Sequence, residues 1–364
     1  MATRLKRIMV GMSGGVDSTV AAAMLKEQGF EVSGVFMQSG FESPNITHKQ
    51  RCCSEDDAED ARRSAELIGV PFYIIDMRKG FEQVIENFID EYNAGRTPNP
   101  CILCNRELKF GKVMEFAIQN GYEAVATGHY CQVEYDADRF WLKRGSDIKK
   151  EQSYSLWMLR QNQLARAVFP LGGMTKKQVR EFAHTRNLPV FSKRESQEIC
   201  FVLDNNYRNF LLEHSPETIK PGEFLDIDGN VLGMHKGHQF YTIGQRRGLG
   251  ITFPYRSYVV EIRGDENIVV IGKHENLFKR GFIGTQVNWQ AIKPNIGEKI
   301  RALMQVRYNH NPPVAEIEVL SEDKVKITFD VKDEAITPGQ SGVCYDLNNE
   351  KLLFGTIIDE VFDD

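Results

Sequence analysis

The sequence predicts an α/β protein in which a parallel-sheet domain is followed by a small, mostly β central domain and a C-terminal β-barrel. Strand-like and helix-like segments alternate over residues 1–204, which is the order of a parallel sheet covered by helices on both faces. Beyond Cys200, short strands separated by turn residues replace that alternation. We therefore expect domains at residues 1–204, 205–279 and 280–364.

The N-terminal alternation can be followed segment by segment. In the first predicted helix Val20, Met24 and Leu25 share one face, and Ser54-Glu55-Asp56-Asp57 is a capping-box pattern that opens another helix. The predicted strands are 7–10, 31–37, 71–76 and 123–127, and the predicted helices are 17–28, 54–68, 81–92 and 105–119.

The C-terminal part is punctuated by turn signals. Pro221-Gly222, Asp228-Gly229 and Gly248-Leu249-Gly250 separate short strands in the central domain. Even spacing and few helices then favour a small barrel. Its predicted strands are 286–289, 299–308, 315–320, 324–329, 342–346 and 352–358.

Composition bounds the class of protein. The 364 residues carry 45 Lys and Arg against 50 Asp and Glu, a net charge of −5. No apolar run approaches the ~18 residues of a membrane span, and no signal peptide is visible, so we expect a cytoplasmic protein without a membrane partner. Seven cysteines are an odd number, which argues against a disulfide framework and leaves metal, redox or catalytic roles.

Positive charge is concentrated in residues 139–194. This segment holds thirteen Lys and Arg against three acidic residues. A solvated charged face is one interpretation. The aromatic residues within it favour a second one, contacts to RNA backbone and bases. These residues are Phe140, Trp141, Tyr154 and Trp157.

A glycine-rich turn lies between the first predicted strand and helix, with the sequence Gly11-Met12-Ser13-Gly14-Gly15-Val16-Asp17-Ser18. Backbone N–H groups in such a turn can approach an anion, and the helix N-terminus adds partial positive charge. The turn lacks the G-K-[ST] ending of a Walker A loop. It is similar to the PP-loop of ATP pyrophosphatases, which grip pyrophosphate and cleave between the α- and β-phosphates.

Two cysteine motifs add candidate thiols. Thr97-Pro98-Asn99-Pro100-Cys101-Ile102-Leu103-Cys104-Asn105 places C-x-x-C at a predicted helix start, where a thiol pKa is lowered. Half of a zinc site, completed by Cys52 and Cys53, is an alternative. Cys200 lies near the end of the stretch 192–201; it is either a buried apolar residue or, in a stretch that also contains Lys193 and Arg194, a thiolate.

With these clusters together, nearly the whole chain resembles the bacterial tRNA-specific 2-thiouridylases. The resemblance also rests on ATGHY at 126–130, YTIGQRRGLG at 241–250 and PGQSGVCY at 338–345. It implies ATP, with Mg²⁺ carried by the nucleotide near Asp17, as cofactors. The implied ATP-binding residues are Gly11, Met12, Ser13, Gly14, Gly15, Val16, Asp17, Ser18, Met37 and Gly128.

The same resemblance implies further roles. Cys104 would be the nucleophile and Cys200 the persulfide carrier, with a transient Cys104–Cys200 disulfide. Some relatives have Asp where this chain has Cys101. The residues implied to face the target base or contact tRNA are Asn99, Pro100, Cys101, His129, Lys150, Glu151, Gln152, Arg307, Tyr308 and Gln340.

The implied reaction is ATP-dependent 2-thiolation of the wobble uridine, position 34, in the tRNA anticodon stem-loop. ATP would adenylate the C2 oxygen, and a protein persulfide would then supply sulfur, giving 2-thiouridine, AMP and pyrophosphate. The persulfide would come from a cysteine desulfurase or a sulfur-relay protein. Two alternatives stay open: a PP-loop ligase or amidotransferase for a small metabolite, and a non-catalytic RNA-binding protein.

Overall fold

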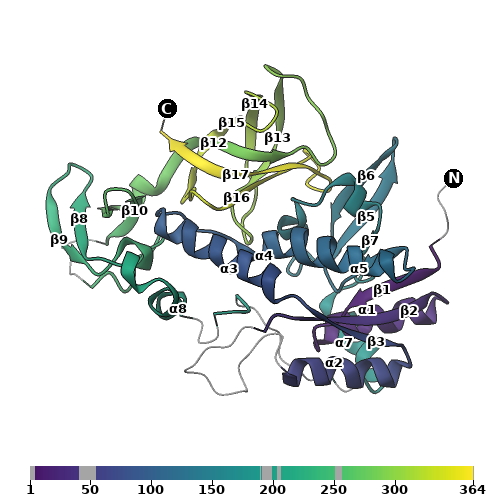
Figure 1. The fold of residues 1–364 in the computed structure, drawn as a ribbon. Coiled ribbons are helices and arrows are strands. Elements are labelled where there is room, and N and C mark those ends of the chain that lie inside the picture. Colours follow the sequence, from purple (N-terminus) through teal and green to yellow (C-terminus); the bar gives the residue numbers. More distant parts are fainter. Residues whose placement is uncertain are drawn as a thin grey trace. The chain divides into compact units, whose positions relative to one another are not determined.

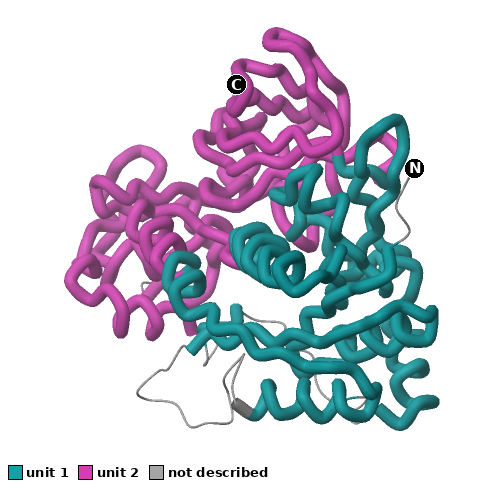
Figure 2. The backbone as a smooth tube through the Cα atoms, turned by 45° about the vertical axis from the view of Figure 1, so that its right-hand side comes forward, with its two compact units in different colours: residues 1–84, 101–205, 350–352 teal, residues 85–100, 206–349, 353–364 magenta. Residues whose placement is uncertain are grey.

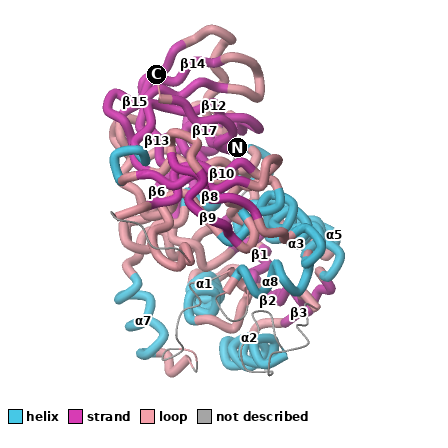
Figure 3. The backbone as a smooth tube through the Cα atoms, turned by 90° about the vertical axis from the view of Figure 1, so that its left-hand side faces the viewer, coloured by secondary structure: helices cyan, strands magenta, loops and turns pink. Residues whose placement is uncertain are grey.

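The chain forms two compact units in a computed structural model that describes residues 5–40, 55–188, 190, 199–202, 206–250 and 256–363. Figure 2 colours the two units separately: unit 1 comprises residues 1–84, 101–205 and 350–352, and unit 2 comprises residues 85–100, 206–349 and 353–364. Most of the helix is in unit 1, whereas unit 2 consists largely of strands (Figure 3). This distribution confirms the predicted α/β class.

A five-stranded parallel sheet is the centre of unit 1 (Figure 1), and it confirms the predicted parallel sheet. Its strand order is β3-β2-β1-β4-β7. Parallel strands place their carboxyl ends at one edge, where open α/β sheets bind ligands. The strands are β1 (Arg7–Gly11), β2 (Glu31–Gln38), β3 (Phe72–Asp76), β4 (Ala124–Ala126) and β7 (Ala167–Val168).

Helices cover both faces of this sheet. Ile8 and Val10 on one face of β1 belong to a core with α1, α2 and α7, while on the other face Tyr73 packs against Phe116 of α5. The helical elements are α1 (Val16–Glu27), α2 (Glu55–Ile68), α3 (Arg78–Asn93), α4 (Pro100–Leu103), the π-helix η2 (Cys104–Lys112), α5 (Val113–Gln119), the 3₁₀ turn η3 (Ser153–Leu156), α6 (Gln161–Leu164) and α7 (Lys176–Thr185).

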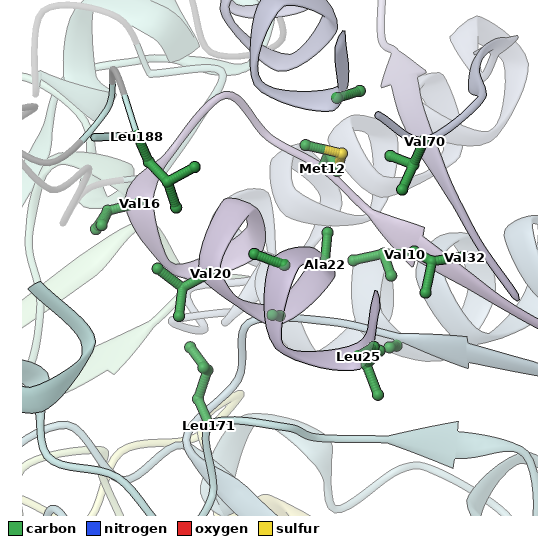
Figure 4. Packing of buried hydrophobic residues seen from close by; sticks show 14 of the residues in the cluster. Val10, Met12, Val16, Val20, Ala22, Leu25, Val32, Val70, Leu171 and Leu188 are labelled. Carbon is green, nitrogen blue, oxygen red and sulfur yellow. The ribbon is translucent and has the colours of Figure 1, made fainter. Parts of the chain in front are cut away.

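The buried face of α1 forms much of this core. Figure 4 shows Val20 of α1 directed toward Leu171, and Val10 and Val32 beside each other on β1 and β2. Small side chains at Ala21, Ala22 and Ala23 let the helix approach the sheet closely. The first turn of α1 is thereby fixed at the carboxyl edge of β1.

Two features of unit 1 differ from the predicted elements. The expected helix 105–119 is interrupted, because its first half is the π-helix η2 and only its second half is the α-helix α5. A hairpin of β5 (Cys131–Asp136) and β6 (Arg139–Arg144) was also not anticipated. Its turn, Ala137-Asp138, has positive φ at both residues without a glycine, so the usual sequence signal is absent.

The aromatic residues of segment 139–194 do not all serve one surface. Tyr154 and Trp157 are fully buried, which makes the RNA-stacking interpretation wrong for these two. Trp141 lies on the hairpin, where the Lys351 ammonium sits 5.0 Å from its ring centroid. The segment 139–194 therefore contributes buried aromatic side chains as well as charged residues.

Unit 2 begins with a small mixed sheet. Its strand order is β10-β11-β8-β9, and Phe224, Val259, Val269 and Ile271 form its core. The elements are α8 (Tyr207–His214), η4 (Pro216–Thr218), β8 (Gly222–Asp226), β9 (Val231–His235), η5 (His238–Phe240), β10 (Tyr258–Arg263), β11 (Ile268–Gly272) and η6 (His274–Leu277).

A closed six-stranded barrel completes unit 2, in the order β12-β15-β14-β13-β16-β17. The predicted barrel is thus confirmed, although its first strand starts at Phe278 and not at Gln286 and includes Gly281 and Gly284. The strands are β12 (Phe278–Asn288), β13 (Lys299–Gln305), β14 (Val314–Val319), β15 (Val325–Glu334), β16 (Ser341–Tyr345) and β17 (Leu352–Phe362).

Replacing Trp157 by alanine tests its place in the core. Trp157→Ala should lower the free energy of unfolding by about 3–5 kcal/mol, because it removes a fully buried aromatic ring. Trp141→Ala is the matched control and should cost about 1 kcal/mol or less. Urea denaturation of the full chain measures both, and equal losses would contradict the assignment.

Candidate nucleotide and thiol site

The glycine-rich turn connects the end of β1 to the start of α1. Gly14 has φ +71°, and a Cβ there would lie 2.6 Å from the Asp57 carbonyl oxygen at the start of α2, so only glycine fits. The Ser13 N–H donates to Ser18 Oγ at 3.1 Å, which folds the turn back on the helix. The turn is therefore held on two sides.

The N-terminus of α1 carries no side-chain cap. Gly15 is the N-cap residue and has no side chain to bond the first N–H groups. Behind it, the Thr19 hydroxyl donates to the Gly15 carbonyl at 2.9 Å. A helix start with this geometry offers backbone donors and positive potential to an anion.

Asp17 in the first turn of α1 is bonded to two residues from distant segments. The Lys176 ammonium donates to its carboxylate oxygens at 2.8 and 2.7 Å. The Tyr130 hydroxyl donates to Asp17 Oδ1 at 2.7 Å. The Lys176 side chain is only 12% exposed, and the residue is the first of α7, after the N-cap Thr175. A lysine thus reaches the loop from another helix.

Gly128 follows β4 and lies against the start of α1. A Cβ at Gly128 would be 2.8 Å from Asp17 Cβ and from the Ser18 nitrogen, so this approach requires glycine. Met37 lies near the end of β2, paired with Ile75 of β3. The structure therefore brings the expected ATP-binding residues 11–18, Met37 and Gly128 to one edge of the sheet.

His129 connects this edge to the π-helix. Its Nδ1 lies 2.6 Å from the Thr127 hydroxyl, and its ring centroid lies 6.4 Å from that of Phe110 in η2. Burial, and secondly the charge of Lys109, hold the His129 pKa well below its usual range. The imidazole is therefore neutral at pH 7 and occupies the space between the loop and η2.

The five described cysteines differ in environment. Burial, followed by nearby carboxylates, raises the pKa of Cys131 and Cys344 well above the usual value, so neither is a nucleophile. Cys101 is exposed, and Cys104 and Cys200 are half-buried. Of the stretch 192–201, residues 192–198 lie outside the described part of the chain, as do Cys52 and Cys53.

The segment before Cys101 is tied down within unit 2. The Arg96 guanidinium bonds Glu91 and Asp359 at 2.8 Å each, and these carboxylates raise its pKa although burial opposes them. The Gln340 amide donates to the Thr97 carbonyl at 2.7 Å. Gln340, Asn99 and Pro100, predicted separately from sequence, are thus parts of one assembly.

The predicted contacts Arg307 and Tyr308 follow β13 in the barrel. The Gln305 amide donates to both of their carbonyls, at 3.0 and 2.7 Å. Arg307 donates to the Glu334 carbonyl at 2.7 Å, while the Tyr308 side chain is exposed. The turn is rigid and presents an aromatic side chain to solvent.

The stretch 150–152 is mostly internal to unit 1. Glu151 is buried and accepts from Arg144 at 2.6 Å. Gln152 exchanges two hydrogen bonds, each 3.0 Å, with the Tyr130 backbone. Lys150 and Gln152 are half-buried, so Glu151 is the most deeply buried of the three.

Much of the positive charge of segment 139–194 is paired locally. Lys143 bonds Glu134, Arg144 bonds Glu151, and Arg186 bonds Glu27. Lys176 bonds Asp17, as described above. The net charge of the segment therefore overstates the charge available to a polyanion.

The described part of the chain holds neither a metal-binding cluster nor a helix that could span a membrane. Residues 5–40, 55–188, 190, 199–202, 206–250 and 256–363 contain no group of three or more His, Cys, Asp and Glu side chains placed to hold a metal ion. In that same part of the chain, no helix combines the length and apolarity needed to cross a bilayer.

Family models account for most of the chain. A tRNA methyl transferase HUP domain matches residues 6–204, a tRNA methyl transferase PRC-barrel domain matches 208–273, and an aminomethyltransferase β-barrel domain matches 279–358. The tRNA-specific 2-thiouridylase MnmA of Carboxydothermus hydrogenoformans is 47% identical over 98% of both chains. The chain belongs to the tRNA-specific 2-thiouridylase family. Proteins of the same name from Desulforamulus reducens and Clostridioides difficile are 48% and 46% identical, over 93% and 94% of this chain and 94% and 95% of their own.

Two residues of this 2-thiouridylase family member were missed by sequence reasoning. Lys176 counted only as one charge of a basic segment, and Tyr130 only as part of the ATGHY motif. The Thr175-x-x-Gln178 capping box does mark a helix that begins at Lys176. That this helix start meets Asp17 is a tertiary contact, which local sequence cannot reveal.

His129 gives the site a pH dependence. Its pKa is lowered in the folded state, so below about pH 6.5 the unfolded chain binds a proton that the folded chain does not. Stability should therefore fall as pH is lowered from 7 to 5, and less steeply in His129→Gln. Urea midpoints at both pH values test this. His235→Gln in unit 2 is the positive control, because burial lowers the His235 pKa to about 4. Both variants should therefore make stability depend less on pH. An unchanged pH dependence of stability in His129→Gln would contradict the assignment.

Proposed function

We propose that this chain is a tRNA-uridine 2-sulfurtransferase that thiolates the wobble uridine, position 34, of tRNA at C2. The observation that carries the proposal is the proximity, within unit 1, of an anion-binding loop and a thiol-bearing helix. Gly128 lies against the loop, and the adjacent His129 contacts η2, which begins at Cys104. The family membership supports the same reaction.

ATP binding is supported by the loop and its surroundings. The uncapped start of α1 and the turn 11–15 suit the pyrophosphate portion of ATP. When nucleotide binds, Lys176 would leave Asp17 and bond phosphate oxygens. It would thereby supply the lysine that the loop itself lacks. Met37 and Gly128 would border the rest of the nucleotide.

Mg²⁺ fits this arrangement only as a metal that arrives with ATP. Asp17 is one carboxylate, and Mg²⁺ is usually held by one or two carboxylates together with substrate phosphates. Bound there, the ion would neutralise phosphate charge. Asp17 would contribute one oxygen, and Lys176 and Tyr130 would orient it.

The proposed chemistry uses two thiols. The uridine O2 attacks the α-phosphorus and expels pyrophosphate, leaving an O2-adenylated base. The terminal sulfur of a Cys200 persulfide then attacks C2 and displaces AMP. The base is now joined to Cys200 Sγ through that sulfur. The Cys104 thiolate attacks Cys200 Sγ; the outer sulfur stays on C2 as 2-thiouridine, and a Cys104–Cys200 disulfide forms. An external thiol reductant reopens it.

Contacts with the tRNA anticodon stem-loop are proposed for residues of both units. Asn99, Pro100 and Cys101 would face the target base, and His129 and Lys150 would lie beside it. Glu151 and Gln152 would act by shaping their stretch, since both are bonded internally. In the barrel Arg307, Tyr308 and Gln340 would contact the stem, with Tyr308 presented to solvent by Gln305.

The persulfide on Cys200 would be delivered by a cysteine desulfurase or a sulfur-relay protein. We further propose three domains at residues 1–204, 205–279 and 280–364. The family matches 6–204, 208–273 and 279–358 support this division. We place the protein in the cytoplasm, where its tRNA substrate is found.

Asp17→Ala tests the nucleotide step. It should abolish tRNA-dependent pyrophosphate release, because the carboxylate that orients Lys176 and the metal is lost. Glu27→Gln is the matched control: it breaks an ion pair at the opposite end of α1 and should leave release unchanged. Similar melting temperatures for both variants would exclude unfolding. Pyrophosphate release from Asp17→Ala at the unaltered rate would remove Asp17 from the site, and release without tRNA would favour a metabolite ligase.

The two thiols should be separable by mass spectrometry. After incubation with a desulfurase and cysteine, Cys200→Ser should lack the protein form that is heavier by one sulfur atom. Cys104→Ser should keep that form yet yield no 2-thiouridine in digested tRNA. Cys101→Asp, which restores the residue of some relatives, should retain activity. Stoichiometric zinc released by changing Cys101 or Cys104 would refute the nucleophile assignment.

A further inference from the structure

A nine-residue π-helix begins at Cys104. The segment Cys104–Lys112 follows the short helix α4 and leads directly into α5. Such helices usually extend over a single turn and are frequent at functional sites. A stretch of this length needs a stabilising contact from outside the helix.

Gln163 of α6 provides that contact. Its side-chain amide donates to the carbonyl oxygens of Arg106 and Phe110, both at 2.9 Å. Its Oε1 accepts from the Arg160 N–H at 3.0 Å, which ties the side chain to the start of α6. Both ends of the amide are therefore used, and the side chain is held in one orientation.

Two further contacts fix the same segment. Asn105 is 1% exposed and donates from Nδ2 to the Ser155 carbonyl at 2.9 Å. Gly111 leaves room for the Arg106 carbonyl, to which an added Cβ would approach within 3.0 Å. The residues next to Cys104 are thus bonded to the segment 153–163. In the π-helix, Gly111 packs against the Arg106 carbonyl, which is one of the two carbonyls that Gln163 bonds.

The π-helical register decides where Cys104 lies. At the end of η2 the Val113 N–H donates to the Leu108 carbonyl, five residues earlier. If one such turn relaxed to an α-helical turn, the preceding residues would move by one position relative to α5, about 100° in rotation and 1.5 Å in translation. A reacting thiol displaced by this amount loses its alignment with a substrate atom.

We propose that Gln163 is a positioning residue for Cys104, acting by holding Cys104–Lys112 in its π-helical register. The inference deepens the proposed function, because it rests on Cys104 as the reacting thiol. Gln163 acts through its hydrogen bonds to η2. Its amide donors satisfy two carbonyls of the wide helix, and the acceptor end anchors that bond to α6.

Gln163→Glu isolates the two donors, since the carboxylate keeps the shape and the acceptor for Arg160. Gln161→Glu is the matched control: Gln161 lies two residues away on α6 and exchanges hydrogen bonds with Phe140 of the hairpin. We expect Gln163→Glu to lower kcat for tRNA thiolation on the order of tenfold or more, with KM for ATP within about twofold. Protonation restores one donor, so the defect should shrink as pH is lowered.

A second readout does not depend on thiolation. Iodoacetamide labelling, followed by peptide mass spectrometry, reports the alkylation rate of Cys104, with the exposed Cys101 as an internal reference. The rate ratio of these two thiols should change several-fold in Gln163→Glu and stay constant in Gln161→Glu. Gly111→Ala, which presses on the Arg106 carbonyl, should change it too and serves if Gln163→Glu fails to fold.

The outcomes separate the two hypotheses. Equal behaviour of Gln163→Glu and Gln161→Glu in both kcat and labelling would overturn the positioning role. A labelling change specific to Gln163→Glu and Gly111→Ala, in an enzyme whose wild type forms no 2-thiouridine, would refute the proposed function and leave the positioning role standing. If Gln163→Glu lost both kcat and thermal stability while Gly111→Ala lost neither, Gln163 would have a structural role only.

Discussion

The site in unit 1 depends on the close approach of the Gly128 backbone to the first turn of α1. A Cβ at Gly128 would stand 2.8 Å from backbone atoms of Asp17 and Ser18, closer than side-chain carbons come to other atoms. This approach joins the end of β4 to the anion-binding loop. It also fixes the next residue, His129, whose ring contacts Phe110 of η2. A larger residue at 128 would separate the loop from the helix that carries Cys104.

Charge in this region is balanced before any substrate arrives. Lys176 and Tyr130 bond the single carboxylate of Asp17, and Arg144 bonds the buried Glu151. The proposed polyphosphate ligand would bring several negative charges, so Lys176 would then bond the phosphates and Asp17 a cation. The ion pair with Asp17 thus keeps Lys176 near the loop. Without it, burying the lysine ammonium there would cost desolvation free energy.

The parallel sheet and the barrel could be predicted because both follow from the local alternation of strand-like and helix-like segments along the chain. The candidate residues in 11–18, Cys104 and Gln340 came from short motifs that resemble those of a known family. Lys176 was not predictable, because its role follows from a contact with Asp17, 159 residues away. The π-helix was not predictable either: residues 105–119 have helical periodicity, and the amide of Gln163, supplied from a separate segment, selects the wider register. Tyr154 and Trp157 are the opposite case. The basic residues around them in the sequence suggested an exposed RNA-binding surface, but both side chains lie in the core.

One of the places where the chain passes between the two units falls within the motif 97–105. Asn99 and Pro100 belong to unit 2, where Arg96 and Thr97 bond Asp359 and Gln340 of the barrel part. Cys101 and Cys104 belong to unit 1, where Gln163 and Ser155 hold η2. One peptide bond, Pro100–Cys101, therefore joins the segment that the barrel residues bond to the segment that leads into η2. Pro98 and Pro100 restrict the backbone before that bond, and α4 begins at Pro100 itself and continues through Leu103. The chain is therefore stiff at this junction, because proline rings fix φ at two positions and a helical turn includes the bond.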